Sequence, residues 1–374
     1  MPRSPSAPPV RVWVWIAATL ALVVVATLLW RNSDAAATES TTSAPADVPP
    51  GTPAGAVEQA WTADGGPLPA DIVEEGRVVV GSDHGVRALD VGTGEVAWHY
   101  TRSNARLCGL TVADGVAVAV FRTADRCDEA VALEAGTGVR AWTRNLSLRG
   151  DAVISSTASI VLAGSPTGVV TFDPRGNNIR WRAGPAEGCR WLGAVAGSAG
   201  VAVLERCADD DVRLRLYDGF EGTERWTVDV PGDAEPSLLG AGELVGVRAG
   251  GEVRLFAPED GALKASLPVG AEEPAAQTSA AGLALVRTGS VLWAVDPASG
   301  ATRWSVPAAG LPAAAPVEVA ELVVPTTEGF VRIDPLTGLE LDRLPAPGVP
   351  SDGMATVLGP VVVLRLADGV RGYR

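Results

Sequence analysis

Four cysteines and a run of three aspartates are the residues of this sequence whose types and spacing most suggest chemistry. Cys108 and Cys127 are 19 residues apart, Cys189 and Cys207 are 18 apart, and Asp209 to Asp211 begin two residues after the last cysteine. Cysteines bind zinc or form disulfides, and clustered carboxylates bind calcium. The surrounding sequence must decide between these chemistries.

Metal and catalytic sites would need further residues that the sequence does not supply. There is no Cys-x-x-Cys, and the two histidines, His84 and His99, lie outside the segments that carry the cysteines. The aspartate run lacks EF-hand spacing; like the pairs Glu74-Glu75 and Glu272-Glu273, it fits an exposed turn. No GxSxG, HExxH or GxxxxGK motif occurs. We therefore expect no metal and no catalytic group.

A repeat of eleven letters sets the elements that position these residues. Residues 88–98 read ALDVGTGEVAW and residues 132–142 read ALEAGTGVRAW, with an acid third, Gly seventh and Trp last. Three further copies keep the acid and the Trp, and two worn copies lack the Trp. The former are residues 171–181, 216–226 and 294–304, and the latter 255–265 and 332–342. Successive copies are 38 to 45 residues apart, so one unit is about 40 residues long.

Each unit contains four short β-rich runs. In the first unit they are Ile72-Val73, Arg77–Gly81, Gly85–Leu89 and Glu95–Tyr100. Turn compositions separate them. We expect Asp90 to hold the third turn through backbone N–H groups, and Gly94 to supply its positive φ. Residues 57–374 show no sustained helical periodicity. Repeated four-stranded units of this length predict an all-β fold, a β-propeller.

The two ends of the folded part complete one blade. The chain ends in GVRGYR, which fits a third strand, and AVEQAW (residues 56–61) fits a fourth strand. Seven motif copies and this shared blade predict an eight-bladed propeller over residues 57–374. The N-terminal strand closes the ring by pairing with the C-terminal blade, which leaves no open sheet edge between first and last blades.

The eleven-letter pattern closely resembles the tryptophan-docking motif, AxDxxTGxxxW, of quinoprotein-type (PQQ-like) propellers. That family includes pyrroloquinoline-quinone dehydrogenases and non-catalytic relatives such as the outer-membrane assembly lipoprotein. The resemblance implies that each Trp lies flat between two blades and caps the next sheet. The matching residues are Trp61, Trp98, Trp142, Trp181, Trp226 and Trp304.

The same resemblance raises the question of a quinone cofactor. The dehydrogenases use a pair of adjacent cysteines, a Ca²⁺ held by side-chain oxygens and an Asp base, built on long insertions. This chain has no Cys-Cys pair, and its blades are close to minimal length. We therefore expect a non-catalytic bacterial member without a cofactor. The arginine-rich composition, in which Lys264 is the only lysine, together with much Ala, Val and Gly, suggests a GC-rich bacterial genome.

The cysteines are expected to form two disulfides. In each pair the first cysteine precedes or opens an innermost strand and the second follows the next strand, two points that antiparallel pairing brings to one edge. We predict Cys108 with Cys127 and Cys189 with Cys207, each worth about 3 kcal/mol in the loop-entropy model. Arginines flank all four cysteines and are expected to gather on that face as a candidate recognition patch. They are Arg106, Arg126, Arg190 and Arg206.

The N-terminal segment predicts a membrane anchor. Residues 12–30 are nineteen residues without a charge, long enough to cross a bilayer as one helix. Because Arg3 and Arg11 precede this stretch, the positive-inside rule places residues 1–11 in the cytoplasm and the propeller outside. A cleaved signal peptide, with Ala35 to Ala37 as its cleavage site, is the alternative.

Residues 31–56 are rich in Ala, Ser, Thr and Pro and are expected to be a disordered linker. As a flexible chain it would hold the propeller about 25 to 30 Å from the membrane. The net charge of −14 argues against binding to nucleic acid or to anionic lipid.

Together these features predict a function. We expect a single-pass protein of the cell membrane whose extracytoplasmic propeller is a non-catalytic scaffold or protein-interaction module for envelope proteins or cell-wall material. The alternatives are a ligand-binding or sensory propeller that takes a small molecule or quinone, and a PQQ-dependent dehydrogenase.

Overall fold

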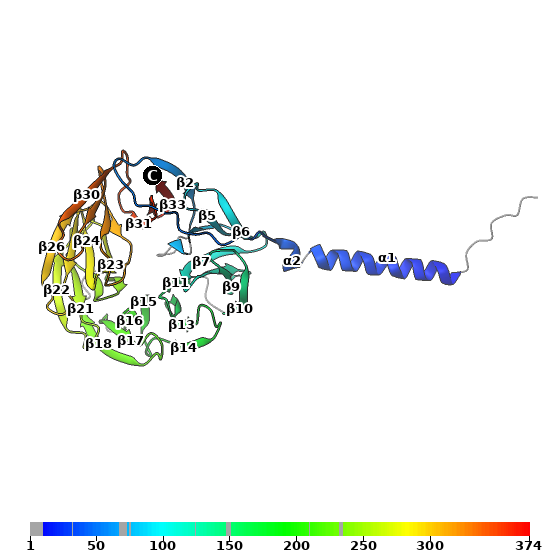
Figure 1. The fold of residues 1–374 in the computed structure, drawn as a ribbon. Coiled ribbons are helices and arrows are strands. Elements are labelled where there is room, and N and C mark those ends of the chain that lie inside the picture. The colour runs from blue at the N-terminus through cyan, green and yellow to red at the C-terminus, as the bar shows by residue number, and fades with distance from the viewer. Residues whose placement is uncertain are drawn as a thin grey trace, which may run out of the picture.

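Short apolar runs separated by turns form eight β-sheets around a central axis in the computed structural model (Figure 1). Each sheet is one blade, so the sequence-based prediction of an eight-bladed propeller is confirmed. The structure describes residues 10–31, 33–66, 73–74, 76–123, 125–146, 151–208, 210–231 and 235–374.

Blades 1 to 6 each contribute four strands in chain order, the first nearest the axis and the fourth at the rim (Figure 1). Blade 1 contains β3 (Val73–Glu74), β4 (Arg77–Ser82), β5 (Gly85–Asp90) and β6 (Val96–Arg102), and blade 2 contains β7 (Arg106–Ala113), β8 (Val116–Arg122), β9 (Cys127–Glu134) and β10 (Arg140–Asn145). Blade 3 contains β11 (Val153–Ser156), β12 (Val161–Ser165), β13 (Gly168–Phe172) and β14 (Ile179–Ala183), and blade 4 contains β15 (Arg190–Gly197), β16 (Gly200–Arg206), β17 (Val212–Tyr217) and β18 (Glu224–Val230). Blade 5 contains β19 (Ser237–Ala241), β20 (Val245–Ala249), β21 (Glu252–Phe256) and β22 (Leu263–Pro268), and blade 6 contains β23 (Ala275–Ala280), β24 (Leu283–Thr288), β25 (Val291–Val295) and β26 (Thr302–Pro307).

Blades 7 and 8 close the ring. Blade 8 combines β31 (Met354–Leu358), β32 (Val361–Arg365) and β33 (Gly369–Tyr373) with the N-terminal β2 (Gln59–Asp64), which pairs antiparallel with β33 as expected. The sheet of blade 7 holds β28 (Leu322–Thr326), β29 (Gly329–Ile333) and β30 (Glu340–Pro345). The short β27 (Leu311–Pro312), which precedes them, pairs in parallel with β31 of blade 8 instead.

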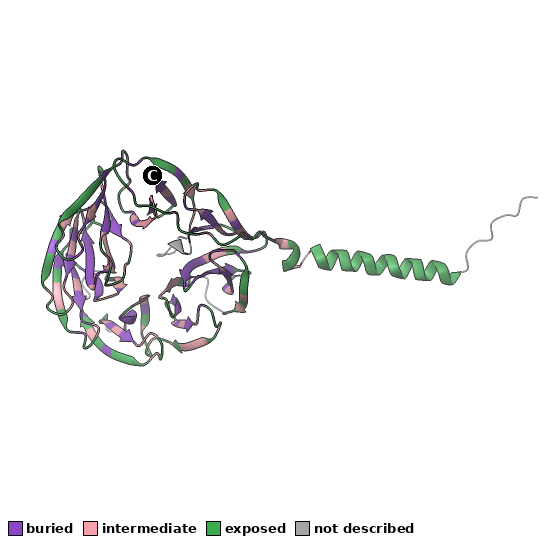
Figure 2. Cartoon of the chain, viewed as in Figure 1, coloured by how far each residue is buried: buried purple, intermediate pink, exposed green. Residues whose placement is uncertain are grey.

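The core lies between blades, because each sheet is packed on both faces. Along β8, every residue from Val116 to Phe121 is completely buried, which explains why this strand is apolar throughout. The buried apolar residues form eight clusters, and each combines side chains from neighbouring blades. In Figure 2 the middle strands of the blades, such as β8, β16 and β24, are accordingly buried, and much of the rim is exposed.

The motif acid holds its turn as the sequence predicts. Oδ1 of Asp90 accepts the backbone N–H groups of Gly92 at 3.0 Å and Thr93 at 3.1 Å, and Gly94 follows with a φ of +73°. Four other copies make the same type of contact, through Asp173, Asp218, Asp296 and Asp334.

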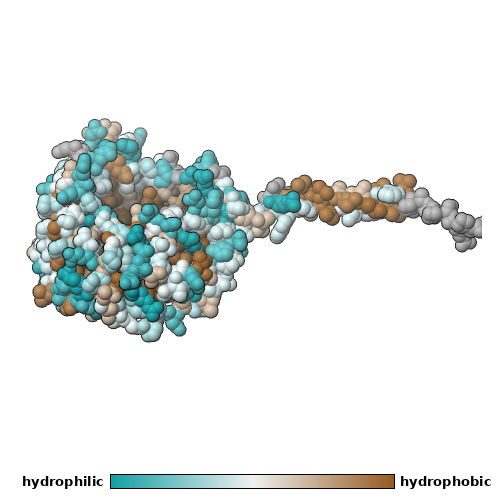
Figure 3. Space-filling model, turned by 90° about the horizontal axis from the view of Figure 1, so that it is seen from above, coloured by the Kyte–Doolittle hydropathy of each residue, from teal (hydrophilic) through white to brown (hydrophobic). Residues whose placement is uncertain are grey.

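One helix precedes the propeller. Helix α1 (Val10–Arg31) has 22 residues, none of them buried, and is long and apolar enough to cross a membrane. Figure 3 shows α1 as an apolar rod that projects from the propeller, whose visible surface is mostly hydrophilic.

The segment expected to be a disordered linker is instead ordered against blade 1, which corrects that prediction for its described residues. We call residues 34–57 the strap. It starts with α2 (Asp34–Ala37) and β1 (Thr38–Ser40), and β1 pairs antiparallel with β6 as a fifth strand of blade 1. The amino-acid composition of the strap does not reveal this ordered position. The strap is held by backbone hydrogen bonds to the free edge of β6 and by polar contacts, neither of which needs an apolar pattern.

Candidate functional site

The six repeat tryptophans lie at the junctions between blades. Each indole N–H donates to a backbone carbonyl in the turn of the following blade, at 2.8 to 3.0 Å. The pairs are Trp61 with Val91, Trp98 with Ala135, Trp142 with Pro174, Trp181 with Gly219, Trp226 with Pro258, and Trp304 with Pro335. A Cβ placed at Gly138 would lie 2.7 Å from the Trp98 ring. The motif Gly therefore leaves room for the indole and also allows the positive φ of the turn.

An arginine directly before the tryptophan is a further element of the motif that sequence reasoning missed. Arg180, Arg225 and Arg303 form ion pairs with the motif acids of their own blades, Asp173, Asp218 and Asp296. The signal was present as the letters RW in three copies. In the last copy Leu341 occupies this position.

These contacts stabilise the charged form of the motif acid. The backbone N–H of Glu221 and then the Arg225 guanidinium hold the pKa of Asp218 below its ordinary value. For Asp296 the hydrogen bond from Arg303 is the main cause of a strongly lowered pKa. The turn is therefore built for an ionised carboxylate.

The two worn copies lack the tryptophan, but other groups close both junctions. A Cβ at Gly300 would lie 2.2 Å from the Lys264 carbonyl oxygen, so the backbone itself covers this turn. Between blades 7 and 8, Phe330 packs edge-on against Tyr373 with ring centroids 5.1 Å apart. Val57 of the strap is buried in the same cluster.

The cysteines form the two disulfides that their spacing predicts. Cys108 is bonded to Cys127 in blade 2, and Cys189 to Cys207 in blade 4. Cys127 is completely buried, whereas Cys189 and Cys207 are partly exposed. Cys108 lies near the start of β7 and Cys127 opens β9, while Cys189 directly precedes β15 and Cys207 directly follows β16. Antiparallel pairing brings the two cysteines of each pair to the same end of their sheet.

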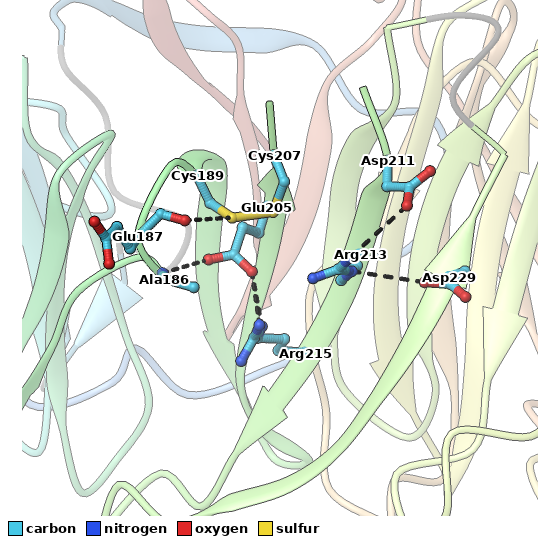
Figure 4. Close-up of a disulfide and its surroundings, with 9 residues drawn as sticks. All are labelled: Ala186, Glu187, Cys189, Glu205, Cys207, Asp211, Arg213, Arg215 and Asp229. Atoms are coloured by element: carbon cyan, nitrogen blue, oxygen red, sulfur yellow. Dashed lines mark hydrogen bonds and ion pairs between the residues drawn. A yellow bond between two sulfur atoms is a disulfide. The ribbon is translucent and has the colours of Figure 1, made fainter. Parts of the chain in front are cut away.

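Glu205 is a buried carboxylate beside the second disulfide (Figure 4). Its side chain is 1% exposed and accepts hydrogen bonds from the Ala186 N–H at 2.9 Å and from Nε of Arg215 at 2.9 Å. Cys189, Glu205 and Cys207 place their ligand atoms within 4.8 Å of one another. Because the two sulfurs are bonded to each other and the carboxylate is bonded to Arg215, this cluster is a structural clamp on the loop before β15.

The predicted arginine patch is divided between two blades. Arg190 and Arg206 are cross-strand partners in blade 4. Arg106 and Arg126 lie in blade 2 and are exposed, and blade 3 stands between the two pairs. Acidic side chains also lie in this part of blade 4, since Arg213 lies between Asp211 and Asp229 (Figure 4). In the aspartate run, Asp209 lies outside the described residues.

A cavity of about 820 Å³ lies at the axis on the side of the innermost hairpins of blades 3 to 7. Small residues dominate its lining, among them Ser156, Ser198 and Ala241. Its charged groups are the Asp218–Arg225 pair and Glu243. No His or Cys lies among the lining residues that the structure describes, and the polar contacts of the cavity come from Ser and Thr hydroxyls, backbone groups and these charged side chains.

The strap is fixed to blade 1 by a buried guanidinium. The Arg102 side chain is 1% exposed and bonds Asp34 at 2.9 Å, Glu129 at 2.8 Å and Asn104 at 3.2 Å. Burial alone lowers the pKa of Arg102, but the charge and hydrogen bond of Glu129 outweigh it and raise the pKa. The contact joins the strap, blade 1 and blade 2 in one place.

Further along, Arg77 repeats this arrangement. Its buried side chain donates to the Ala44 carbonyl in the strap, at 3.1 Å, and to Gly136 in blade 2, and it pairs with Asp90. The Ser43 N–H donates to the Thr137 carbonyl at 2.9 Å. The strap therefore spans the first junction of the ring.

Comparison with known proteins agrees with this architecture. A protein-family model described as outer membrane protein assembly factor BamB matches residues 27–184 and 165–347. Curated protein sequences give no significant match.

Solved structures share the fold at low sequence identity. The computationally designed Ika8 protein is 14% identical with a TM-score of 0.56, over 87% of this chain and 99% of that one. Quinohemoprotein alcohol dehydrogenase ADHIIG from Pseudomonas putida HK5 is 13% identical with a TM-score of 0.51, over 86% and 76%. BamB from Moraxella catarrhalis is 15% identical with a TM-score of 0.49, over 85% and 99%. A designed protein and an enzyme share this fold, so the fold does not select an activity.

Proposed function

Since this chain belongs to the family described as outer membrane protein assembly factor BamB, we propose that it is a non-catalytic scaffold or protein-interaction module of the bacterial cell envelope. Helix α1 tethers it to the cell membrane with residues 1–11 in the cytoplasm and the propeller outside. Its partners are envelope proteins or cell-wall material. The assembly role belongs to the named factor, and here it supports interaction with other proteins in general.

The strap is the observation that carries this proposal. It builds the segment after the helix into the propeller, since Asp34 reaches the buried Arg102 and the Ala37 carbonyl accepts the Ser103 N–H at 2.9 Å. Cleavage after Ala37 would remove these contacts, which favours a retained anchor over a signal peptide. Three residues from Arg31 to Asp34 span at most about 10 Å, so the propeller stands close to the membrane.

The experiment measures the anchor and the chemistry separately. For the anchor, the intact mass of the membrane-bound chain is expected to include residues 1–37, and protease added outside the cell is expected to reach the propeller. A mature chain that begins at Thr38 would contradict the anchor. For the chemistry, pyrroloquinoline quinone with Ca²⁺ is expected to give neither dye-linked turnover nor a melting shift. Turnover would contradict the scaffold role.

A ligand-binding propeller is the second candidate function, and the axial cavity favours it. A volume of about 820 Å³ is within the usual range of small-molecule sites, roughly 300 to 1,000 Å³. Its hydroxyl groups and backbone amides suit a polar ligand. A melting shift with the quinone but without turnover would support this candidate over the scaffold.

A further inference from the structure

Blade 7 carries an unusual group of exposed leucines. Leu336, Leu339 and Leu341 are 63%, 67% and 54% exposed. They follow one another in the outer turn of the blade and at the start of β30, so they lie within one hairpin end. We call these three residues the blade 7 patch. Among the described residues, the corresponding turns of the other blades expose at most one large apolar residue each, such as Val96, Val139 or Leu263.

The repeat shows that the fold does not require these leucines. In three other blades the position of Leu341 holds an arginine, and that arginine pairs with the motif acid. In blade 7 the acid, Asp334, still holds its turn through the N–H groups of Leu336 and Thr337, at 2.9 Å each. The hydrogen bonds that hold the turn therefore do not require an apolar side chain at position 341.

Acidic side chains surround the patch. The outer part of blade 7, residues 321–345, contains five acids and two arginines. Glu328, Glu340 and Asp342 have side chains that are 79%, 46% and 46% exposed. Arg343 and Arg332 pair with some of them, and residues 321–345 together carry a formal charge of −3. Glu340 and Asp342 are the acids directly beside Leu341, whereas Glu328 lies toward the other end of the sheet.

This combination selects one class of occupant. An anionic lipid surface would meet this negative charge, and a second copy docked on the same patch by a two-fold axis would bring the same acids together. A partner segment with apolar side chains bordered by Lys or Arg satisfies both the leucines and the acids. We propose that the blade 7 patch is a docking site for such a basic, apolar segment of another envelope protein. The site deepens the scaffold role and rests on it.

Direct binding to a synthetic probe tests the site. The probe is a fluorescent amphipathic peptide of leucine and lysine, and its control has glutamate in place of lysine. The full chain is placed in nanodiscs of uncharged lipid, and peptide binding is measured by fluorescence anisotropy. The signal from empty nanodiscs is subtracted. We expect the lysine peptide to bind at least ten-fold more tightly than the glutamate peptide, and high salt to weaken it.

Matched variants locate the binding. Leu336→Ser, Leu339→Ser and Leu341→Ser together are expected to weaken the lysine peptide at least ten-fold. Val96→Ser, Val139→Ser and Leu263→Ser, whose side chains are similarly exposed, are expected to leave it unchanged. Both triple variants are expected to melt like the original chain, because all six side chains lie on the surface.

Three outcomes would overturn the docking site. The first is equal affinity for the two peptides, and the second is an equal loss of affinity for the lysine peptide in the two triple variants. The third is a dimer, detected by sedimentation, that the blade 7 triple variant converts to monomer, because the patch would then be a contact between copies. None depends on turnover or on membrane retention, so failure of this site is distinguishable from failure of the scaffold role.

Discussion

Blade 1 and blade 7 derive from the same repeat, yet their sheets end in opposite ways. The sheet of blade 1 has five strands, because β1 of the strap covers β6, whereas the sheet of blade 7 has three, because β27 pairs with the next blade. Trp98 of blade 1 is completely buried, while Asp342 stands at the matching position of blade 7 and is exposed. The outer edge of blade 1, β6, is covered by β1 of the same chain, whereas β30, the outer strand of blade 7, pairs only with β29 among the described residues.

The motif and the residues around it therefore have separate roles. The motif acid and glycine form the turn in both blades. The two blades differ outside the motif, where the strap is added to blade 1, and at variable positions within it, where Leu336, Leu339 and Leu341 of blade 7 match Gly92, Glu95 and Ala97 of blade 1.

The largest expected effect is the loss of a junction tryptophan. Trp98→Ala removes a fully buried indole and its hydrogen bond to Ala135, which is expected to lower the apparent free energy of unfolding by about 4 kcal/mol. Denaturant unfolding followed by fluorescence and circular dichroism measures it. Asp342→Ala in blade 7 is the control and is expected to change it by less than about 0.5 kcal/mol. Similar losses in both variants would refute the contrast between the junctions.

Arg102→Met tests the strap. It leaves Glu129 without its buried partner, so we expect a loss of about 3 kcal/mol and faster hydrogen exchange in β1. The matched change in blade 7 is Arg343→Met, whose pairs with Glu340 and Glu328 are exposed; we expect less than about 1 kcal/mol there. Unchanged exchange in β1 would show that Arg102 does not hold the strap.

Lowering the pH is expected to destabilise the turns that the motif aspartates hold, most strongly where the aspartate makes the most contacts. Asp218, Asp296 and Asp334 have pKa values lowered from 3.8 in the folded chain. The unfolded chain therefore binds more protons as pH falls below about 4, and the stability that these acids contribute above that pH is lost. Melting curves between pH 6 and pH 3 measure the loss. Asp296→Asn is expected to flatten the pH dependence more than Asp334→Asn, and the reverse order would contradict the role given to Arg303.

The smallest effect concerns Leu341→Arg, which restores to blade 7 the arginine of other blades. We expect it to lower the pKa of Asp334 further, as Arg303 does for Asp296, with less than about 0.5 kcal/mol change in stability. Carbon NMR of the labelled carboxyl group measures the pKa. An unchanged pKa would mean that the position does not face the motif acid.

The repeat made most of the ring predictable from sequence. Seven copies at nearly constant spacing define the blades, and GVRGYR with AVEQAW reveals the closure, because a strand without a hairpin partner needs one elsewhere. The disulfide pairs follow from the same strand order. These inferences depend on local pattern, and a repeat supplies each pattern several times.

Local sequence patterns could not predict the strap or the residues that fill the junction between blades 7 and 8. Asp34 meets Arg102 across 68 residues, and no local letter marks that encounter. Val57 is buried in the apolar cluster between blades 7 and 8, although it lies in the strap near the start of the propeller. Both arrangements depend on contacts between segments that are far apart in the sequence.

In the proposed arrangement, blade 1 holds the membrane anchor of the chain and blade 7 holds a partner. Photo-crosslinking in intact membranes tests it most directly, with a photoreactive residue in place of Glu39 in β1 or of Leu339 in the blade 7 patch. Position 39 is expected to link within the chain, to the neighbourhood of Thr101. Position 339 is expected to link to another polypeptide, and to lose that link when Leu336→Ser and Leu341→Ser are added. Partner links from position 39, or none from position 339, would contradict the account.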